Sequence, residues 1–200
     1  RVLARWVGRL FVLLLLGVGL VLTFGPAQIE SDRNAVVDLD PFTISEDARA
    51  LHDTLIVGDW HADSLLWKRD IADRGDRGHV DIPRLIEGNV ALQVFAAVTK
   101  SPAGQNYDSN SADAFDNITP LAIGQLWPPR TWNSLLERAL YQAEKLQDVQ
   151  RRRPERVSII KTRADLEAHL EARSAGSKAV GAILGIEGAH ALEGDIDREC

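Results

Sequence analysis

Apolar residues recur along this chain with spacings that alternate between those of strands and those of helices. Four short runs have the length and composition of strands, and they lie at 54–59, 90–98, 156–161 and 179–186. An amphipathic stretch over 133–150 repeats apolar residues at helical spacing, and Thr162 with Asp165 forms a capping box at the start of another helix. Because strands and helices alternate without a hairpin signal, the sequence predicts an α/β fold with a parallel sheet.

The amino-terminal segment follows a different pattern. Leu10–Ala27 carries no charged residue and would span about 27 Å as a helix, close to the thickness of a bilayer core. Arg5 and Arg9 precede it, which keeps that end cytoplasmic and exports the rest of the chain. We favour an uncleaved signal anchor, since the run is longer than a typical signal-peptide core. A signal peptide cleaved near Gly25–Ala27 is the alternative.

Composition and charge narrow the classes of function. The apolar content of 45% and charged content of 26% are those of an ordinary globular protein. The net charge is −6, and the first 30 residues contribute +2, so the remainder carries −8. Such an acidic chain argues against nucleic acid as a partner. Cys200 is the only cysteine, so any metal must be held by imidazole and carboxylate groups.

Acidic and imidazole groups of that kind follow two of the predicted strands. Asp59, His61 and Asp63 alternate in sequence, so a strand would point all three the same way, and Leu55–Val57 before them is typical of a buried strand. Glu187 follows the apolar run at 179–186. We expect the first and fourth strands to end side by side, which would assemble His, Asp and Glu into a metal hydrolase site.

Three ordered motifs resemble the membrane dipeptidase (renal dipeptidase) family of zinc peptidases, in the amidohydrolase superfamily. They are Asp-Trp-His-Ala-Asp at 59–63, the stretch from Gly-His-Val-Asp-Ile-Pro-Arg-Leu to Gln-Val-Phe at 78–95, and Gly-Ile-Glu-Gly-Ala-His at 185–190. The resemblance covers roughly residues 50–195. Asn89 and Ala189 stand where the family usually has glycine, which can change the local backbone because glycine tolerates a positive φ.

The resemblance implies a fold and a mechanism. His61 and Asp63 would bind one zinc ion, Glu187 would bridge two, and two histidines from later strands would complete the site. A metal-activated water, positioned by Glu187, would hydrolyse dipeptides. Asp59 is a candidate for orienting one of the metal ligands without binding the metal itself. His79 and His190 lie in matched motifs, whereas His52 and His169 are expected to be structural.

The domain organisation follows from these features. We expect a signal segment at 1–27, a linker at 28–45, and at 46–200 the amino-terminal half, about four βα units, of a TIM-like (β/α)₈ barrel. A barrel needs about 250 residues, so the chain looks truncated and inactive alone. An insertion at 99–131 would lie near the active face, and Ser45 would cap a short helix.

Other interpretations of the function stay open. The same scaffold could hydrolyse a lactone or another amide, or it could be a tethered metal-binding domain without catalysis.

The expected location is a bacterial inner membrane with the catalytic part facing the periplasm or the exterior, or secretion after cleavage. A homodimer is a further expectation.

Overall fold

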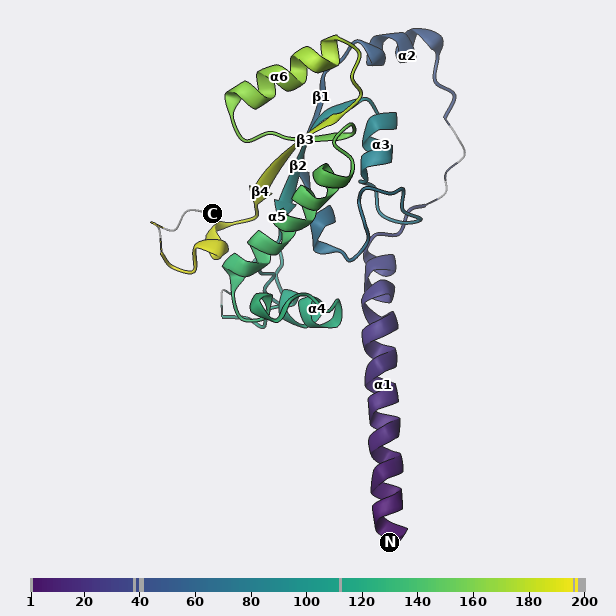
Figure 1. Cartoon of the computed structure of the whole chain (residues 1–200), viewed down its shortest axis with the longest axis vertical. Coiled ribbons are helices and arrows are strands. Elements are labelled where there is room, and N and C mark those ends of the chain that lie inside the picture. The colour runs from purple at the N-terminus through teal and green to yellow at the C-terminus, as the bar shows by residue number, and fades with distance from the viewer. Residues whose placement is uncertain (1, 38, 40–41, 112, 196, 198–200) are drawn as a thin grey trace.

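The computed structural model describes residues 2–37, 39, 42–111, 113–195 and 197 (Figure 1). In chain order the helices and strands are α1 (Val2–Arg33), α2 (Glu46–Asp53), β1 (Val57–Ala62), α3 (Ile82–Glu87), β2 (Val90–Ala97), α4 (Ile118–Gly124), α5 (Leu135–Arg152), β3 (Val157–Ile159), α6 (Arg163–Ser174) and β4 (Val180–Ile186). Short 3-10 turns are η1 (Ser64–Leu66), η2 (Pro129–Thr131) and η3 (Ala189–Leu192).

The expected helix caps are present. The Ser45 hydroxyl accepts a hydrogen bond from the Ala48 amide at the start of α2. Thr162 and Asp165 cap each other's backbone amides at the start of α6. Each such cap stabilises a helix end by roughly 1 kcal/mol, because it satisfies amides that have no partner within the helix.

All four strands form one parallel sheet in the order β1-β2-β4-β3. This confirms the α/β class and is consistent with part of a TIM-like barrel. The expectation that the first and fourth strands end side by side is wrong, because β2 lies between β1 and β4. The eight-residue apolar run of β2 gains most from burial at the centre, whereas the three-residue β3 takes an edge position.

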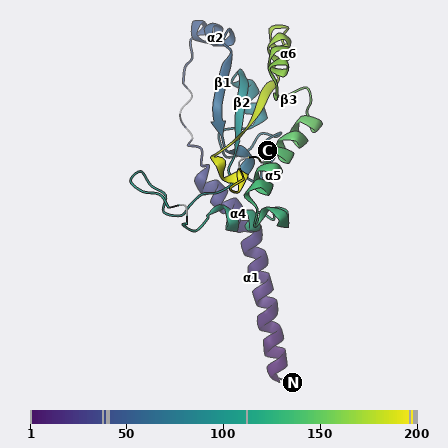
Figure 2. The ribbon, with the colours of Figure 1, turned by 90° about the vertical axis from the view of Figure 1, so that its left-hand side faces the viewer.

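The core lies between the sheet and the helices α3 and α5. Phe95 of β2 and Val180 of β4 are fully buried, and they pack with Ile82 of α3 and Leu146 of α5. Burial of each such side chain contributes about 1.5–3 kcal/mol. Figure 2 shows the sheet above α1, which extends away from it.

β1 starts later than predicted, and the apolar residues just before it are exposed. The strand begins at Val57, and Leu55 and Ile56 before it are 48% and 67% exposed. Both residues lie in the connection between α2 and β1, before the strand joins the sheet. The prediction of a buried strand at Leu55–Val57 is therefore wrong for its first two residues.

The segment 99–131 is built around one buried arginine. It contains α4 and η2, and Arg138 of α5 reaches into it, 1% exposed. The Arg138 guanidinium donates to the Asp116 carboxylate over 2.6 Å. Gln142, also on the inner face of α5, is fully buried and bonds both backbone groups of Val98. Apolar packing alone therefore does not account for α5.

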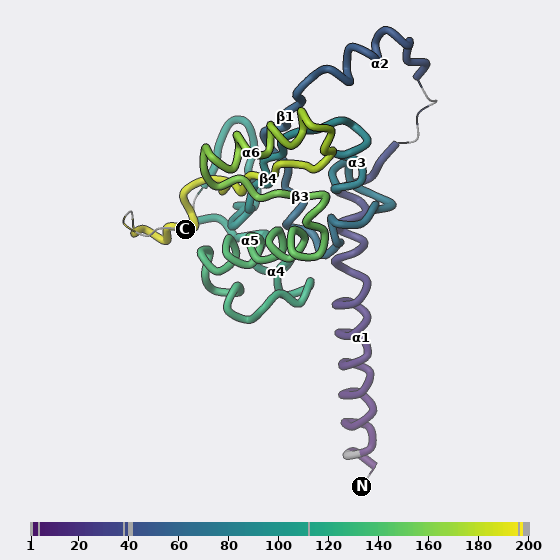
Figure 3. Tube along the Cα trace, turned by 45° about the horizontal axis from the view of Figure 1, so that its top comes forward, coloured from purple at the N-terminus to yellow at the C-terminus, as the bar shows by residue number. Residues whose placement is uncertain are grey.

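α1 docks on the rest of the chain through its last turns. The helix continues past Ala27 to Arg33, and Glu30 is buried against Arg69 and Arg77 of the loop that follows η1. The Gly78 amide donates to the Asn34 carbonyl over 2.8 Å. Figure 3 shows α1 as a rod whose upper end lies beside α3. The helix end is thus held by the fold.

Two family departures have different consequences for the backbone. Asn89 has a φ of 54°, so the chain here does adopt the left-handed conformation that glycine favours. Asparagine tolerates this conformation, and its side chain is fixed by the His52 and Leu55 carbonyls and by Arg173. Ala189 has no positive φ, so its Cβ is accommodated in η3 without strain.

Candidate metal centre

The three expected ligands meet at the carboxyl ends of β1 and β4. One ligand atom from each of His61, Asp63 and Glu187 lies within 4.8 Å of the others. β2 separates the two strands, but the carboxyl ends of parallel strands share one edge of the sheet, so the side chains converge across it. This edge is where parallel α/β folds place their functional groups.

A β-bulge aims His61 toward the group. Asp59 pairs with Gln93 and Ala62 pairs with Phe95, so β1 holds one more residue than β2 between the two pairs. Consecutive residues of a regular strand face opposite sides, yet Trp60 and His61 are both exposed. The extra residue therefore re-aims the imidazole, as bulges commonly do beside functional sites.

Asp63 has already left the strand. It precedes η1 with φ −88° and ψ 25°, and its Oδ1 atom lies 3.0 Å from Nε2 of His61. That oxygen is shielded from solvent, and among the described residues its contact is the His61 ring rather than a hydrogen-bond donor. A shielded carboxylate oxygen is stabilised by a positive group bound beside it.

Glu187 is placed by the backbone of its neighbours. It follows β4 directly, and its amide donates to the Ala97 carbonyl at the end of β2. Gly188 then turns the chain with a φ of 74°, and a Cβ there would lie 3.2 Å from Nδ1 of His190. The turn requires glycine, and it leaves the Glu187 carboxylate exposed at the sheet edge.

This donor set fits zinc. Zinc takes imidazole nitrogen and carboxylate oxygen at about 2.0–2.2 Å, which separates two ligands of one tetrahedral ion by about 3.3 Å. The His61–Asp63 separation of 3.0 Å is close to this value. Glu187 offers two oxygens, which suits a carboxylate shared by two ions about 3.5–4 Å apart.

Asp59 is not among the three grouped ligands. Its Oδ1 atom accepts a hydrogen bond from the His61 amide over 3.1 Å, and Gln93 reaches its carbonyl. The expectation that Asp59, His61 and Asp63 share one strand face is wrong, because the bulge intervenes and Asp63 lies outside the strand. Asp59 instead fixes the backbone of the bulge.

The remaining histidines differ in their surroundings. His169 is buried, and its ring nitrogens contact the Ser158 hydroxyl and the Ala91 carbonyl, each over 2.9 Å. Burial lowers its pKa, so it is neutral and structural, as the sequence predicted. His79 and His190 are exposed, and neither belongs to the three-residue group.

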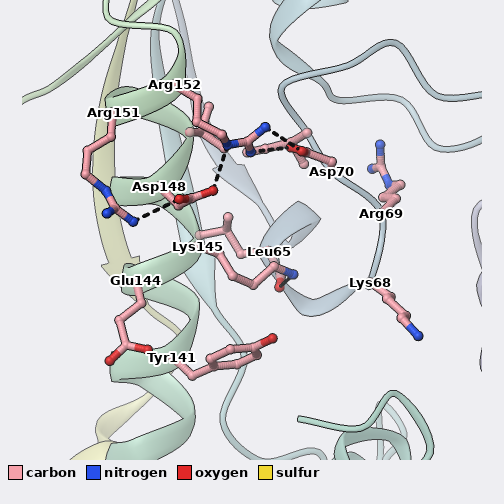
Figure 4. Close-up of a pocket in the computed structure, with 12 residues that line it drawn as sticks. Leu65, Lys68, Arg69, Asp70, Tyr141, Glu144, Lys145, Asp148, Arg151 and Arg152 are labelled. Atoms are coloured by element: carbon pink, nitrogen blue, oxygen red, sulfur yellow. Dashed lines mark hydrogen bonds and ion pairs between the residues drawn. The ribbon is translucent and has the colours of Figure 1, made fainter. Parts of the chain in front are cut away.

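A lysine that the sequence interpretation missed supports the segment after Asp63. Lys145 of α5 donates to the carbonyls of Leu65 and Trp67. Burial lowers its pKa to about 8. It lines a cavity of about 390 Å³ between α5 and the loop, which the three candidate ligands do not line (Figure 4). No sequence signal separates it from the surface lysines of an amphipathic helix.

A parallel α/β sheet with imidazole and carboxylate groups at its carboxyl edge is an arrangement suited to a metal-dependent hydrolase. The model of one family, membrane dipeptidase (peptidase family M19), matches residues 45–198. The chain therefore belongs to the membrane dipeptidase family, a family of zinc enzymes, which confirms the resemblance that its motifs indicated. A search of curated proteins finds no match to the chain.

Proposed function

We propose that this chain carries the zinc-binding part of a metallodipeptidase that is exported and tethered to the bacterial inner membrane. The observation that carries the proposal is the convergence of His61, Asp63 and Glu187 at one sheet edge. Family membership supports hydrolysis of a peptide bond as the reaction. The exposed position of the group leaves room for a dipeptide to approach it.

The protein's own residues hold and orient the reacting groups. His61 would hold zinc through Nε2, the nitrogen that faces Asp63. Asp63 would supply an anionic oxygen, and Glu187 would hold the metal and orient the attacking water. Asp59 positions His61 through its amide. Zinc, when bound, would acidify a water and polarise the scissile carbonyl.

Tethering is supported by the composition and by the docking of α1. The helix from Arg5 to Arg33 is long and apolar enough to cross a membrane, and its apolar stretch is not buried by the rest of the described chain. Its arginines favour a cytoplasmic amino terminus, which would export residues 46–200. The contacts of Glu30 beyond residue 27 would hold the catalytic part against a retained anchor.

Zinc content and turnover test the proposal. We expect His61→Ala and Glu187→Gln each to lower the zinc retained per chain after dialysis and to reduce dipeptide hydrolysis by the full-length protein at least a hundredfold. His52→Ala, an exposed histidine at the opposite end of β1, is the matched control and should change neither value. Unchanged zinc content and turnover in both site variants would refute the assignment. Zinc binding without turnover of any dipeptide would favour a non-catalytic metal domain.

A further inference from the structure

A small cationic pocket lies where α1 leaves its apolar stretch. Its volume is about 200 Å³. One wall is apolar and belongs to the last turns of that stretch, with Leu22, Pro26 and Ala27 among its residues. The other wall is formed by the loop after η1 and carries three basic residues, Lys68, Arg69 and Arg77. The pocket therefore joins a hydrocarbon-compatible surface to a group of cations.

The cations outnumber the acidic residues that face the pocket. Among the described lining residues Glu30 alone is acidic, and it lies 3.2 Å from Nε of Arg69 and 3.3 Å from Nη2 of Arg77. Asp81 acts on Arg69 from outside the lining. Asp76 also pairs with Arg77, but from an exposed position outside the lining. Lys68 is exposed, and Figure 4 shows its side chain directed away from α5.

Two of the guanidinium donors are buried without an acceptor among the described residues. Nη1 of Arg69 and Nε of Arg77 are shielded from solvent and form no hydrogen bond within that part of the chain. A buried N–H group without a partner costs roughly 1–3 kcal/mol, so such donors normally meet an anion or another acceptor. Phosphate oxygens match guanidinium donors both in charge and in planar geometry.

The level of the pocket in the proposed membrane selects the source of the phosphate. Leu10–Ala27 would fill the hydrocarbon core, so residues 22–27 reach its outward-facing boundary. Glu30 and the cations beside it then lie at the headgroup layer of that leaflet. α4 lies at the same level, since a Cβ on Gly124 would approach Pro26 to 3.3 Å, and Leu126 just after it is 62% exposed. Apolar surface beside basic surface is typical of proteins that contact a bilayer interface.

We propose that Lys68, Arg69 and Arg77 bind the phosphate of an anionic phospholipid headgroup beside α1. This inference rests on the proposed membrane anchoring. The headgroup phosphate would balance the charge of these cations, which outnumber the one acidic residue, Glu30, among the described residues that line the pocket. Its acyl chains would lie along Leu22 and Pro26. The lipid would then fix the loop after η1, and with it the orientation of the catalytic part over the membrane.

Anchoring is tested first and separately. Membranes that contain the chain are washed with alkaline carbonate, and the chain should stay in the pellet. Release into the supernatant would overturn both the anchoring and the lipid site. Retention supports the anchoring, and the lipid site is then decided by a second experiment.

Lipid binding is measured as the thermal stability of the full chain in neutral detergent, titrated with short-chain phosphatidylglycerol. We expect a saturable rise in Tm that phosphatidylcholine does not give. Lys68→Ala should weaken the apparent affinity about fivefold, and Lys68→Glu should weaken it further. Lys178→Ala and Lys178→Glu, at an exposed lysine before β4, remove or reverse the same charge elsewhere and should leave the affinity unchanged.

Two results would overturn the lipid site. The first is an equal response of the Lys68 and Lys178 variants, which would mean that the chain attracts anionic lipid without a specific pocket. The second is an equal rise in Tm with inorganic phosphate at the same concentration, which would make the pocket a site for free anions. Arg69 and Arg77 are left intact in these variants, because their removal would leave Glu30 buried without a counter-charge.

Discussion

Two of the ion pairs that involve an aspartate are built in opposite ways. Asp116 and Arg138 lie 2.6 Å apart, and the arginine side chain is 2% exposed. Asp63 and His61 lie 3.0 Å apart, and their side chains are 43% and 56% exposed. The first pair is enclosed by the segment that it organises, whereas the second lies open at the edge of the sheet.

The hydrogen bonds of the two pairs differ even more. All five N–H groups of Arg138 are used, and the acceptors are Asp116, Thr119 and the carbonyls of Thr99, Thr131 and Trp132. Burial tends to raise the pKa of Asp116, but hydrogen bonds from Ser101 and Arg138 hold it below its usual range. The shielded oxygen of Asp63 contacts the His61 ring and forms no hydrogen bond within the described residues. The Arg138 pair is completed by the protein itself, whereas the Asp63 pair can still accept a cation.

The largest effect is expected from breaking the enclosed pair. Arg138→Met should destabilise the chain by about 3–5 kcal/mol, because the Asp116 carboxylate loses its charged partner and the enclosed carbonyls that Arg138 bonds lose their donor. The measurement is urea unfolding of the full chain in detergent. Arg130→Met is the matched control, since its ion pairs with Glu137 and Glu144 are exposed, and it should cost less than about 1 kcal/mol. Equal losses in the two variants would contradict the comparison.

Much of this architecture follows from local sequence pattern. The strands, the caps at Ser45 and Thr162, and the convergence of His61 with Glu187 depend on spacing and on residue type, and both can be read along the chain. The bulge at Trp60 and His61 could not be predicted, because it is defined by pairing with a strand some 30 residues away. The position of β2 between β1 and β4 is likewise a property of the whole sheet.

The buried polar residues were missed for a related reason. Arg138 and Lys145 occupy an amphipathic helix on which most charged residues face solvent, and only tertiary contacts distinguish the buried ones. Glu30 in the same way follows an apolar run and resembles the start of a polar linker, but it packs against two arginines from a distant loop. The sequence shows which side chains are polar, but it does not show which of them are buried in the folded chain.

An intermediate effect is expected from Lys145, which connects α5 to the segment after Asp63. Burial lowers its pKa to about 8 in the folded chain, against 10.5 ordinarily, so the unfolded chain binds more protons between these values and stability rises with pH in that window. The cost of Lys145→Met should therefore grow between pH 7 and pH 10, by up to about 3 kcal/mol.

Thermal unfolding of wild type and Lys145→Met at both pH values measures this difference. Lys178→Met, at an exposed lysine, is the control and should show a difference that does not change with pH. A cost for Lys145→Met that stays constant from pH 7 to pH 10 would show that the lysine is not charged at a penalty in the folded chain.

The smallest effect should come from removing the open pair in the absence of metal. His61→Ala should change the free energy of unfolding of the metal-free chain by less than about 0.5 kcal/mol, because the imidazole is largely exposed and supports no packing. Zinc should make the free energies of unfolding of wild type and His61→Ala differ. At a concentration a hundredfold above its dissociation constant it should stabilise the wild-type chain by about 2.7 kcal/mol and His61→Ala far less. Differential scanning calorimetry with chelator and with zinc measures both quantities. A large loss of unfolding free energy in metal-free His61→Ala would contradict this. It would mean that His61 and Asp63 stabilise the fold, as Arg138 and Asp116 do, and are not reserved for a metal.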